Sequence, residues 1–322
     1  MRTKIVYVLV SQETDYYYEM LLLSLYSLRL HHPKGDAEVE VVMDEDTHQR
    51  LVEKKAEMLS DVTPVVVSIP PEYTVMQRSR YLKTQLRKIV KGDFLYIDCD
   101  TLICESLEDI DKMESNIAMV ADANGEVKEK TPYAIELCKK AGIQNVNNQP
   151  YFNSGVFLAK DNTCAHLFFE KWYHLWRKSL SNGVPQDQPA LCQANIDMYY
   201  PIKELPEIWN SQIGFVSEVG MNQSKIFHYF SPKETLMRLM VFESIRKGLL
   251  ANTFGELIQN PRTIGVSVFS IPDSRLMPFL LSNSFYIYDN IPSLQRITLY
   301  CNRFLTYVYV GCHKIKQLVK SF

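Results

Sequence analysis

The sequence predicts an α/β protein built on an open, mostly parallel β-sheet flanked by helices. In the first hundred residues, short β-branched and apolar runs alternate with segments of helical length and spacing, a pattern typical of such sheets. Polar side chains follow several of these runs, and ligands of such sheets bind beyond the carboxyl ends of the strands. With 322 residues, 46% of them hydrophobic, the chain can form one large domain or two ordinary ones.

Each element of this first stretch has its own sequence signal. The first strand is rich in β-branched residues, and the helix after it stops at Pro33. The second strand is followed by a polar helix with Asp44 or Asp46 near its cap. A third helix is basic and amphipathic, and the fourth strand begins after Gly92. The expected order is strand 4–10, helix 19–33, strand 39–43, helix 44–59, strand 63–70, helix 78–90 and strand 92–98.

The pattern changes to helical segments beyond about residue 231. We therefore expect a sheet domain over residues 1–233 and a mainly helical extension over residues 234–322. From Pro292 to Phe322 the chain has five Lys or Arg and no Asp or Glu, with apolar residues at helical spacing. Such a basic helix either lies as a peripheral contact on an anionic inner membrane surface or packs on the main domain with its charges in water.

Composition argues against several classes of protein. The formal net charge of −2 disfavours nucleic acid as a partner. Seven cysteines without a Cys-x-x-Cys pair indicate reduced thiols rather than a disulfide framework or a zinc site. No segment approaches the roughly 20 apolar residues that a membrane span needs, and the short first apolar run indicates a strand rather than a signal peptide. We expect a cytoplasmic globular protein.

The fourth strand ends in two carboxylates, Asp98 and Asp100, within "FLYIDCDTLI". Side chains alternate along an extended chain, so these two acids project to one side and Cys99 to the other. Such a pair can hold a divalent cation through oxygen, and the cation can neutralise a diphosphate leaving group. The alternative is that one of the acids merely caps the next element.

Further motifs follow these acids in a fixed order. They are "LYIDCDTLI" (95–103), "YFNSGVFLAKD" (151–161), "PQDQPAL" (185–191), "LPEIWN" (205–210) and "KIFHYFSPK" (225–233). Together they resemble glycosyltransferase family 8, the family of glycogenin and of bacterial lipopolysaccharide galactosyl- and glucosyltransferases, from Ile5 to Lys233. The resemblance implies a Rossmann-like GT-A fold, a UDP-sugar donor, a manganese ion and transfer with retention of anomeric configuration.

The resemblance makes Asp98 and Asp100 the metal-binding pair, with Asp98 also near the ribose. His228 matches the histidine that completes the metal site. An imidazole beside carboxylates favours manganese, and magnesium is the alternative ion. The alternative for His228 is a core histidine between aromatic residues.

The resemblance also assigns residues to the sugar. Asn153 hydrogen-bonds the donor sugar, and Gly155 lets the chain pass close to it. Asp187 and Gln188 lie against the transferred sugar, where a neutral side chain can stabilise a positive anomeric carbon. The alternatives are an ordinary strand entered through a turn for the first pair, and an N-terminal helix cap for Asp187.

The loop after the first strand corresponds to the family's binding site for uracil and ribose. Ser11 stands at the strand end, and Tyr17 fits best for stacking on the base, with its two neighbouring tyrosines as competing candidates. Arg80 and Lys83 occupy the place of a cation near the diphosphate and sugar, although a basic helix is also often just solvated.

The chain departs from the family pattern after the histidine. Lys233 stands one place earlier than the lysine that grips the diphosphate, and no Pro-Trp follows it. Lys233 is therefore predicted to bind the UDP-sugar donor, and the tail that carries it is predicted to close over UDP in a different way.

The predicted function is metal-dependent, retaining transfer of galactose or glucose from a UDP-sugar to a glycan or lipid-linked saccharide. With Gln188 nearest the sugar, we expect attack from the face that UDP leaves, and Asp187 is the alternative nucleophile. A sugar-nucleotide pyrophosphorylase is disfavoured because "VSQETDYYYEM" lacks a glycine and a base. The alternative function, a catalytically degenerate protein that only binds a UDP-sugar, is compatible with the sequence.

Overall fold

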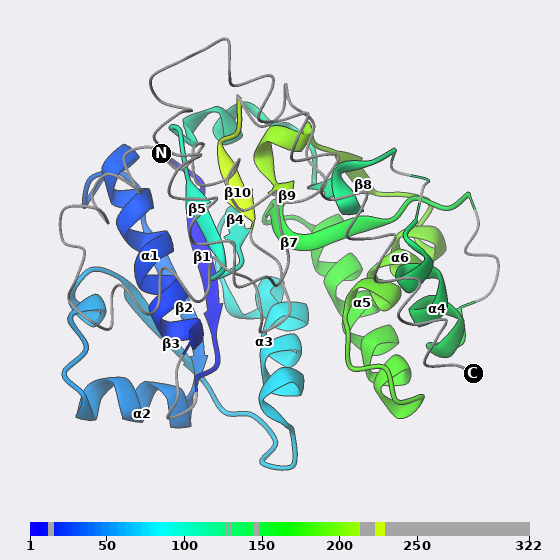
Figure 1. Ribbon diagram of the computed structural model, residues 1–322, viewed down its shortest axis with the longest axis horizontal. Coiled ribbons are helices and arrows are strands. Elements are labelled where there is room, and N and C mark those ends of the chain that lie inside the picture. The colour runs from blue at the N-terminus through cyan, green and yellow to red at the C-terminus, as the bar shows by residue number, and fades with distance from the viewer. Residues whose placement is uncertain (12–15, 127, 129, 144–147, 213–222, 229–322) are drawn as a thin grey trace, which may run out of the picture. The chain divides into compact units, whose positions relative to one another are not determined.

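The computed structural model describes residues 1–11, 16–126, 128, 130–143, 148–212 and 223–228. A seven-stranded sheet in the order β3-β2-β1-β4-β7-β6-β8 forms its centre (Figure 1). Within this sheet β7 runs antiparallel to both of its neighbours, and the other strand pairs are parallel. This confirms the α/β class with a mostly parallel sheet that the sequence predicts.

The first half of the sheet follows the predicted order of elements. These are β1 (Lys4–Leu9), α1 (Tyr16–His31), β2 (Val39–Asp44), α2 (Glu45–Glu53), β3 (Thr63–Val67), α3 (Val75–Ile89) and β4 (Phe94–Ile97). Asp44, rather than Asp46, caps α2 by accepting a hydrogen bond from the Thr47 backbone N–H at 2.9 Å. Helix α2 ends before the predicted boundary, where Lys55 takes a left-handed conformation with φ of 51°.

The second half of the described chain completes both sheets. Its elements are β5 (Thr101–Ile103), β6 (Ile117–Ala121), α4 (Pro132–Lys140), β7 (Phe152–Ala159), α5 (Thr163–Ser181), α6 (Gln188–Asp197), β8 (Ile202–Glu204), β9 (Ser211–Gln212) and β10 (Ile226–His228). A smaller sheet has the order β5-β10-β9. Antiparallel pairing of β10 with β5 sets His228 opposite Thr101, directly after the two predicted metal-binding acids.

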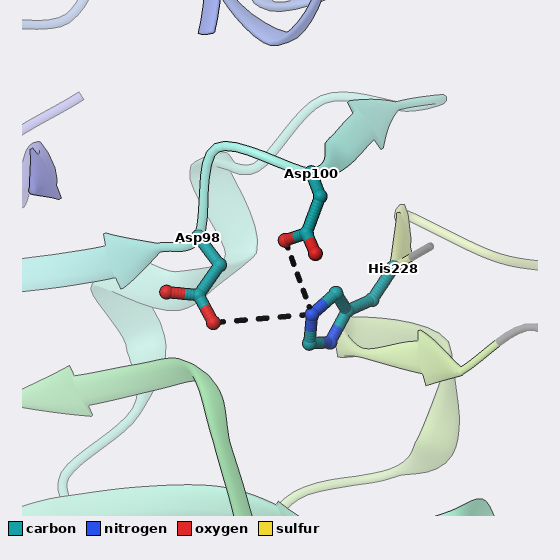
Figure 2. A group of neighbouring side chains, drawn as sticks. All are labelled: Asp98, Asp100 and His228. Carbon is teal, nitrogen blue, oxygen red and sulfur yellow. Dashed lines mark ion pairs between the residues drawn. The ribbon is translucent and has the colours of Figure 1, made fainter. Parts of the chain in front are cut away.

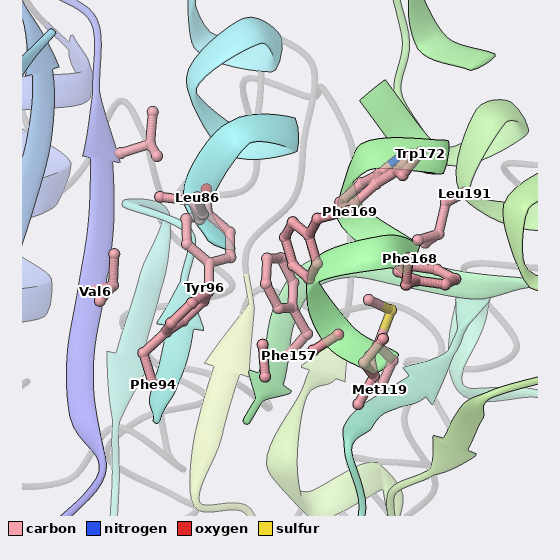
Figure 3. Packing of buried hydrophobic residues seen from close by; sticks show 14 of the residues in the cluster. Val6, Leu86, Phe94, Tyr96, Met119, Phe157, Phe168, Phe169, Trp172 and Leu191 are labelled. Carbon is pink, nitrogen blue, oxygen red and sulfur yellow. The ribbon is translucent and has the colours of Figure 1, made fainter. Parts of the chain in front are cut away.

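The two faces of the sheet are covered by different helices. Val6 of β1 belongs to a buried cluster with Leu86 of α3 and the aromatic residues of β4, β7 and α5 (Figure 3). Tyr7 alternates to the opposite face, where its hydroxyl lies 3.0 Å from Ser24 of α1. In the aromatic cluster the rings of Tyr96 and Phe157 stack with centroids 4.7 Å apart. This packing fixes β4 and β7 beneath the polar residues at their ends.

No helix of the described residues has both the length and the apolar character that crossing a bilayer requires. Lys233 and the extension at 234–322 lie outside the described residues. The predicted domain division, the role of Lys233 and the membrane contact of the basic helix therefore stay predictions.

Candidate active site

The acids predicted to bind metal lie on the short connection between β4 and β5. The Asp98 backbone N–H donates to Gly155 O of β7 at 2.7 Å, and the Thr101 hydroxyl donates to Asp98 O at 2.9 Å. Cys99 is turned away and its thiol donates to Val8 O at 3.3 Å. The chain bends at Cys99 and Asp100 instead of extending β4, and this bend presents both carboxylates on one side, as predicted.

His228 meets these carboxylates from the smaller sheet, as Figure 2 shows. Its Nε2 lies 3.3 Å from Asp100 Oδ1 and 3.9 Å from Asp98 Oδ2. One ligand atom from each of the three residues lies within 4.8 Å of the others. Two carboxylate oxygens and an imidazole nitrogen at this separation fit a divalent ion such as manganese.

The protonation of Asp100 reflects the same contact. Burial acts to raise the pKa of Asp100, but the neighbouring imidazole of His228 outweighs burial and lowers that pKa. Asp100 is therefore ionised near neutral pH.

Lys83 and Tyr96 hold the other acid, Asp98. Lys83 is only 1% exposed, and its Nζ lies 2.9 Å from Asp98 Oδ1 and 3.1 Å from Ser154 O. The Tyr96 hydroxyl donates to Asp98 Oδ1, and burial, then the Asp98 charge, raises the pKa of Tyr96 well above its usual value. Lys83 thus lies beside the cluster of acids, and its ammonium group contacts the Asp98 carboxylate.

Arg80, one turn earlier on α3, is paired with Asp187. Arg80 Nε lies 3.0 Å from Asp187 Oδ1. Burial opposes the charge on Arg80, but Asp187 and Asp98 outweigh it and raise the pKa of Arg80. Burial would likewise raise the pKa of Asp187, yet Lys83 and Arg80 lower it. The two residues form an ion pair in which Asp187 is buried and Arg80 is partly exposed.

Asp187 does not use its carboxylate to cap α6, the alternative that the sequence left open. It occupies the N-cap position, but its side chain makes no capping hydrogen bond. The backbone here is held by α5, because Trp172 Nε1 donates to Asp187 O at 3.0 Å and Trp176 Nε1 donates to Pro185 O at 2.9 Å. The carboxylate is therefore available for a role in the site.

Gln188 and Asn153 meet at Asp122, a residue at the end of β6. Gln188 Nε2 donates to Asp122 Oδ1 at 2.9 Å and to Phe152 O at 3.2 Å, so both amide hydrogens are engaged. Asn153 Nδ2 donates to Asp122 Oδ1 at 3.1 Å. The carbonyl oxygen Oε1 of Gln188 is consequently the side-chain atom that can contact a ligand.

Gly155 has a second requirement beside the predicted close approach to the sugar. A Cβ at this position would lie 2.1 Å from Cε1 of His228 and 2.9 Å from Asn153 Oδ1. The imidazole therefore occupies the space that a side chain at position 155 would need.

Ser11 follows strand β1, and Tyr17 lies in the first turn of helix α1. Ser11 is buried; its N–H donates to Thr47 Oγ1 at 2.9 Å and its carbonyl accepts from Arg50. Tyr17, at the start of α1, is 49% exposed. Ser11 lines a pocket of about 420 Å³, whose lining residues are Val10, Ser11, Asp46, Arg50, Tyr73, Thr74, Val75 and Arg78. Because β1 and β4 are parallel neighbours, this pocket and Asp98 lie at the same edge of the sheet.

Sequence reasoning missed three polar residues of the site: Asp122, Asn210 and Ser154. Asp122 follows the buried run "IAMVA" as Asp98 follows "FLYI", so the signal of an acid after a strand was present. Asn210 lies in the motif at 205–210, where its side chain contacts His228 at 2.9 Å. The contact of Ser154 with Lys83 is made by the serine backbone carbonyl, for which no residue type is a signal.

Comparison with known proteins identifies the family. The sequence pattern of Glycosyl transferase family 8 matches residues 8–233 of the chain. The chain therefore belongs to glycosyl transferase family 8. No curated protein sequence matches this family 8 glycosyltransferase significantly.

Solved structures agree with this assignment. An active-site mutant of LgtC is similar over 76% of this chain and 96% of its own, with a TM-score of 0.51 and 14% identity. GlyE, a glycosyltransferase of Streptococcus pneumoniae TIGR4, is similar over 85% of this chain and 66% of its own, with a TM-score of 0.50 and 16% identity. At such identities these likenesses show the fold alone, which is the predicted GT-A fold.

Proposed function

We propose that this glycosyltransferase moves a hexose, galactose or glucose, from a UDP-sugar to a hydroxyl of a glycan or lipid-linked saccharide, with retention of anomeric configuration and with a divalent ion. The observation that carries the proposal is the convergence of Asp98, Asp100 and His228 from two different sheets. Asp98 and Asp100 are partly exposed and His228 is buried. Titratable residues that converge in this way around a group with a perturbed pKa, here Asp100, are candidates for a binding role.

These three residues would hold the ion, with manganese as the proposed species and magnesium as the alternative. A bound divalent ion supplies positive charge that stabilises a leaving diphosphate. The chain prepares for it because the Tyr96 hydroxyl holds the Asp98 carboxylate before any ligand arrives.

Arg80, Asp187 and Gln188 support the placement of the donor sugar beside this cluster. Asp187 Oδ2 is buried without a hydrogen bond of ordinary geometry from the described residues, and the Ser154 side chain lies beside this carboxylate. A buried acceptor of this kind suits a sugar hydroxyl as donor. Gln188 offers Oε1, and a carbonyl oxygen carries the partial negative charge that steadies a positive anomeric carbon.

The pocket beside Ser11 supports the proposed position of the nucleoside. It lies beyond the carboxyl end of β1, where sheets of this kind bind nucleotides. Tyr17 is exposed enough to offer a ring face to a base.

In the proposed reaction the bond between the anomeric carbon and the UDP oxygen breaks, and its electron pair leaves with UDP. The acceptor hydroxyl oxygen bonds to the same face of that carbon, and its proton passes to a phosphate oxygen of UDP. The ion pair with Arg80 favours a binding role for Asp187 over the alternative role of nucleophile, because pairing lowers the reactivity of a carboxylate.

A UDP-release assay tests the function. Purified protein is incubated with UDP-galactose or UDP-glucose and with Mn²⁺, Mg²⁺ or EDTA, in the presence and absence of saccharide acceptors. We expect UDP release with Mn²⁺, its loss in EDTA and in Asp100→Asn, and its retention in Asp109→Asn. Asp109 is a matched control because it is an exposed acid paired with Lys112 and Lys225.

The same preparations distinguish the proposed transferase from a degenerate binding protein and from a pyrophosphorylase. A thermal shift with UDP-sugar and Mn²⁺ but no UDP release with any donor would indicate a degenerate binding protein. Pyrophosphate-dependent formation of UTP from a UDP-sugar would indicate a pyrophosphorylase. Product anomers read by proton NMR decide between retention and inversion.

A further inference from the structure

His228 is held on the side away from the carboxylates by a buried asparagine. Its Nδ1 lies 2.9 Å from Oδ1 of Asn210, and Asn210 is fully buried. Its Nε2 is the nitrogen turned towards Asp98 and Asp100 (Figure 2). Which of the two nitrogens carries the proton of the neutral ring therefore decides whether Nε2 presents a lone pair to a metal ion.

The orientation of Asn210 follows from a chain of hydrogen bonds with a single direction. At its far end, Oδ1 of Asn153 accepts from the Gly155 backbone N–H at 2.9 Å, and a backbone N–H can only donate. Asn153 Nδ2 donates to Asp122 at 3.1 Å, and an ionised carboxylate can only accept. Both ends of the Asn153 amide are thus fixed independently.

This fixed amide sets the next one. Asn210 Nδ2 donates to Asn153 Oδ1 at 2.9 Å. The reverse orientation would place two carbonyl oxygens against each other in a buried position, which costs free energy. Asn210 therefore presents Oδ1, an acceptor, to His228 Nδ1.

We propose that Asn210 is a positioning residue that keeps the proton of His228 on Nδ1, so that Nε2 faces Asp98 and Asp100 with its lone pair. Without Asn210, the two carboxylates would draw the proton to Nε2, where it would hydrogen-bond to Asp100 and occupy the atom that a metal ion needs. The inference rests on the proposed function of the cluster as a metal site. Partners of this kind, acting behind a metal-ligating imidazole, typically contribute 10- to 100-fold in metal affinity.

The direct test is the protonation of His228 Nδ1 in metal-free protein. Long-range proton–nitrogen NMR on ¹⁵N-histidine-labelled protein, at pH about 8.5 where an ordinary histidine is neutral, reports which ring nitrogen carries hydrogen. The signal is assigned by its loss in His228→Gln, among the seven histidines of the chain. We expect Nδ1 to be protonated in the wild type, and an unprotonated Nδ1 would overturn the inference without any further variant.

Three variants extend the test. Asn210→Leu removes the acceptor, so Nδ1 should lose its proton and the affinity for Mn²⁺ alone should fall about 10- to 100-fold. Asn210→Asp keeps an acceptor for Nδ1–H, so Nδ1 should stay protonated; its second oxygen would face Asn153 Oδ1 in place of a donor, so stability should fall. Asn195→Leu is the matched control, because Asn195 is buried and accepts one hydrogen bond from Ile202 N at 3.2 Å. It should leave both readings unchanged.

The outcomes separate this inference from the proposed function. A protonated Nδ1 and wild-type Mn²⁺ affinity in Asn210→Leu would reject the positioning role while leaving the metal site intact. Loss of the Nδ1 proton in Asn210→Asp as in Asn210→Leu, with both folded, would reject it as well. Failure of the wild type to bind Mn²⁺ would reject the proposed metal site, and the NMR reading of Nδ1 would still decide the role of Asn210.

Discussion

Replacing Gly155 with alanine should displace the imidazole of His228 from the proposed metal site, although His228 itself is unchanged. The added Cβ would lie 2.1 Å from His228 Cε1 and 2.7 Å from Nδ1. Carbon atoms pack at about 3.5 Å or more, so the ring has to retreat by roughly 1.4 Å. Metal-to-ligand distances tolerate deviations of only about 0.2 Å, so a shift of this size removes the imidazole from the site.

The expected result is a loss of Mn²⁺ affinity as large as that of His228→Ala, together with a loss of about 1–3 kcal/mol in the free energy of unfolding from overpacking. Mn²⁺ titrations followed by electron paramagnetic resonance give the affinity, and urea unfolding gives the stability. In the double variant Gly155→Ala/His228→Ala the smaller side chain at position 228 makes room, so the two stability losses should be clearly non-additive.

Gly183→Ala is the matched control for this prediction. Gly183 has φ of +77°, and a Cβ added there would meet no atom within 4 Å. Alanine at this position therefore costs about 1–2 kcal/mol through backbone strain alone. It should lower stability and leave Mn²⁺ affinity unchanged. Wild-type Mn²⁺ affinity in Gly155→Ala would refute the packing of His228 against β7.

Three further predictions concern charge in the site. Lys83 and Arg80 lower the pKa of Asp187, so the ionised carboxylate should contribute its full stabilisation at pH values above the unfolded-state pKa of about 4. In urea unfolding, the wild type should lose its stability advantage over Asp187→Asn as the pH falls below that pKa. A stability difference that stays constant with pH would contradict this. Lys83→Met should strengthen Mn²⁺ binding at low salt because a positive charge 2.9 Å from Asp98 is removed, and weaker binding would show that Lys83 mainly orients the carboxylate. Mn²⁺ at about 100 times its dissociation constant should raise the unfolding free energy by about 2.7 kcal/mol in wild type and by much less in Asp100→Asn.

The sequence was sufficient to predict the sheet from β1 to β4 and the carboxylates after it. Strands β1, β2 and β4 are buried and mostly apolar, and β3 at the end of the sheet is partly exposed. The acids of "FLYIDCD" follow β4 directly, so local pattern and position at the strand end carry the same information. The antiparallel direction of β7 was not predictable, because an apolar run has the same composition in either direction.

The partners of the site residues were less accessible to sequence reasoning. Strands β5 and β10 have three residues each, too few to show a period, yet their pairing brings His228 to Asp100. Motif order could place His228 in the metal site only through the family resemblance. The roles of Asp122 and Asn210 depend on which amide end faces which neighbour, a property of the packed structure.

The ion pairs that Arg80 and Lys83 form with carboxylates also bear on why a divalent ion is needed. Both cations were predicted beside the diphosphate, yet Arg80 lies against Asp187 and Lys83 against Asp98. Two cations already neutralised by two carboxylates give little net positive charge to a ligand with two phosphates. Charge for the diphosphate must then come from an ion held by Asp100 and its neighbours, from the arginines that line the pocket beside Ser11, or from residues outside the described part of the chain, of which Lys233 is the predicted one. On this reasoning UDP affinity should depend steeply on Mn²⁺, and a UDP affinity that is independent of Mn²⁺ would mean that the protein itself supplies the charge.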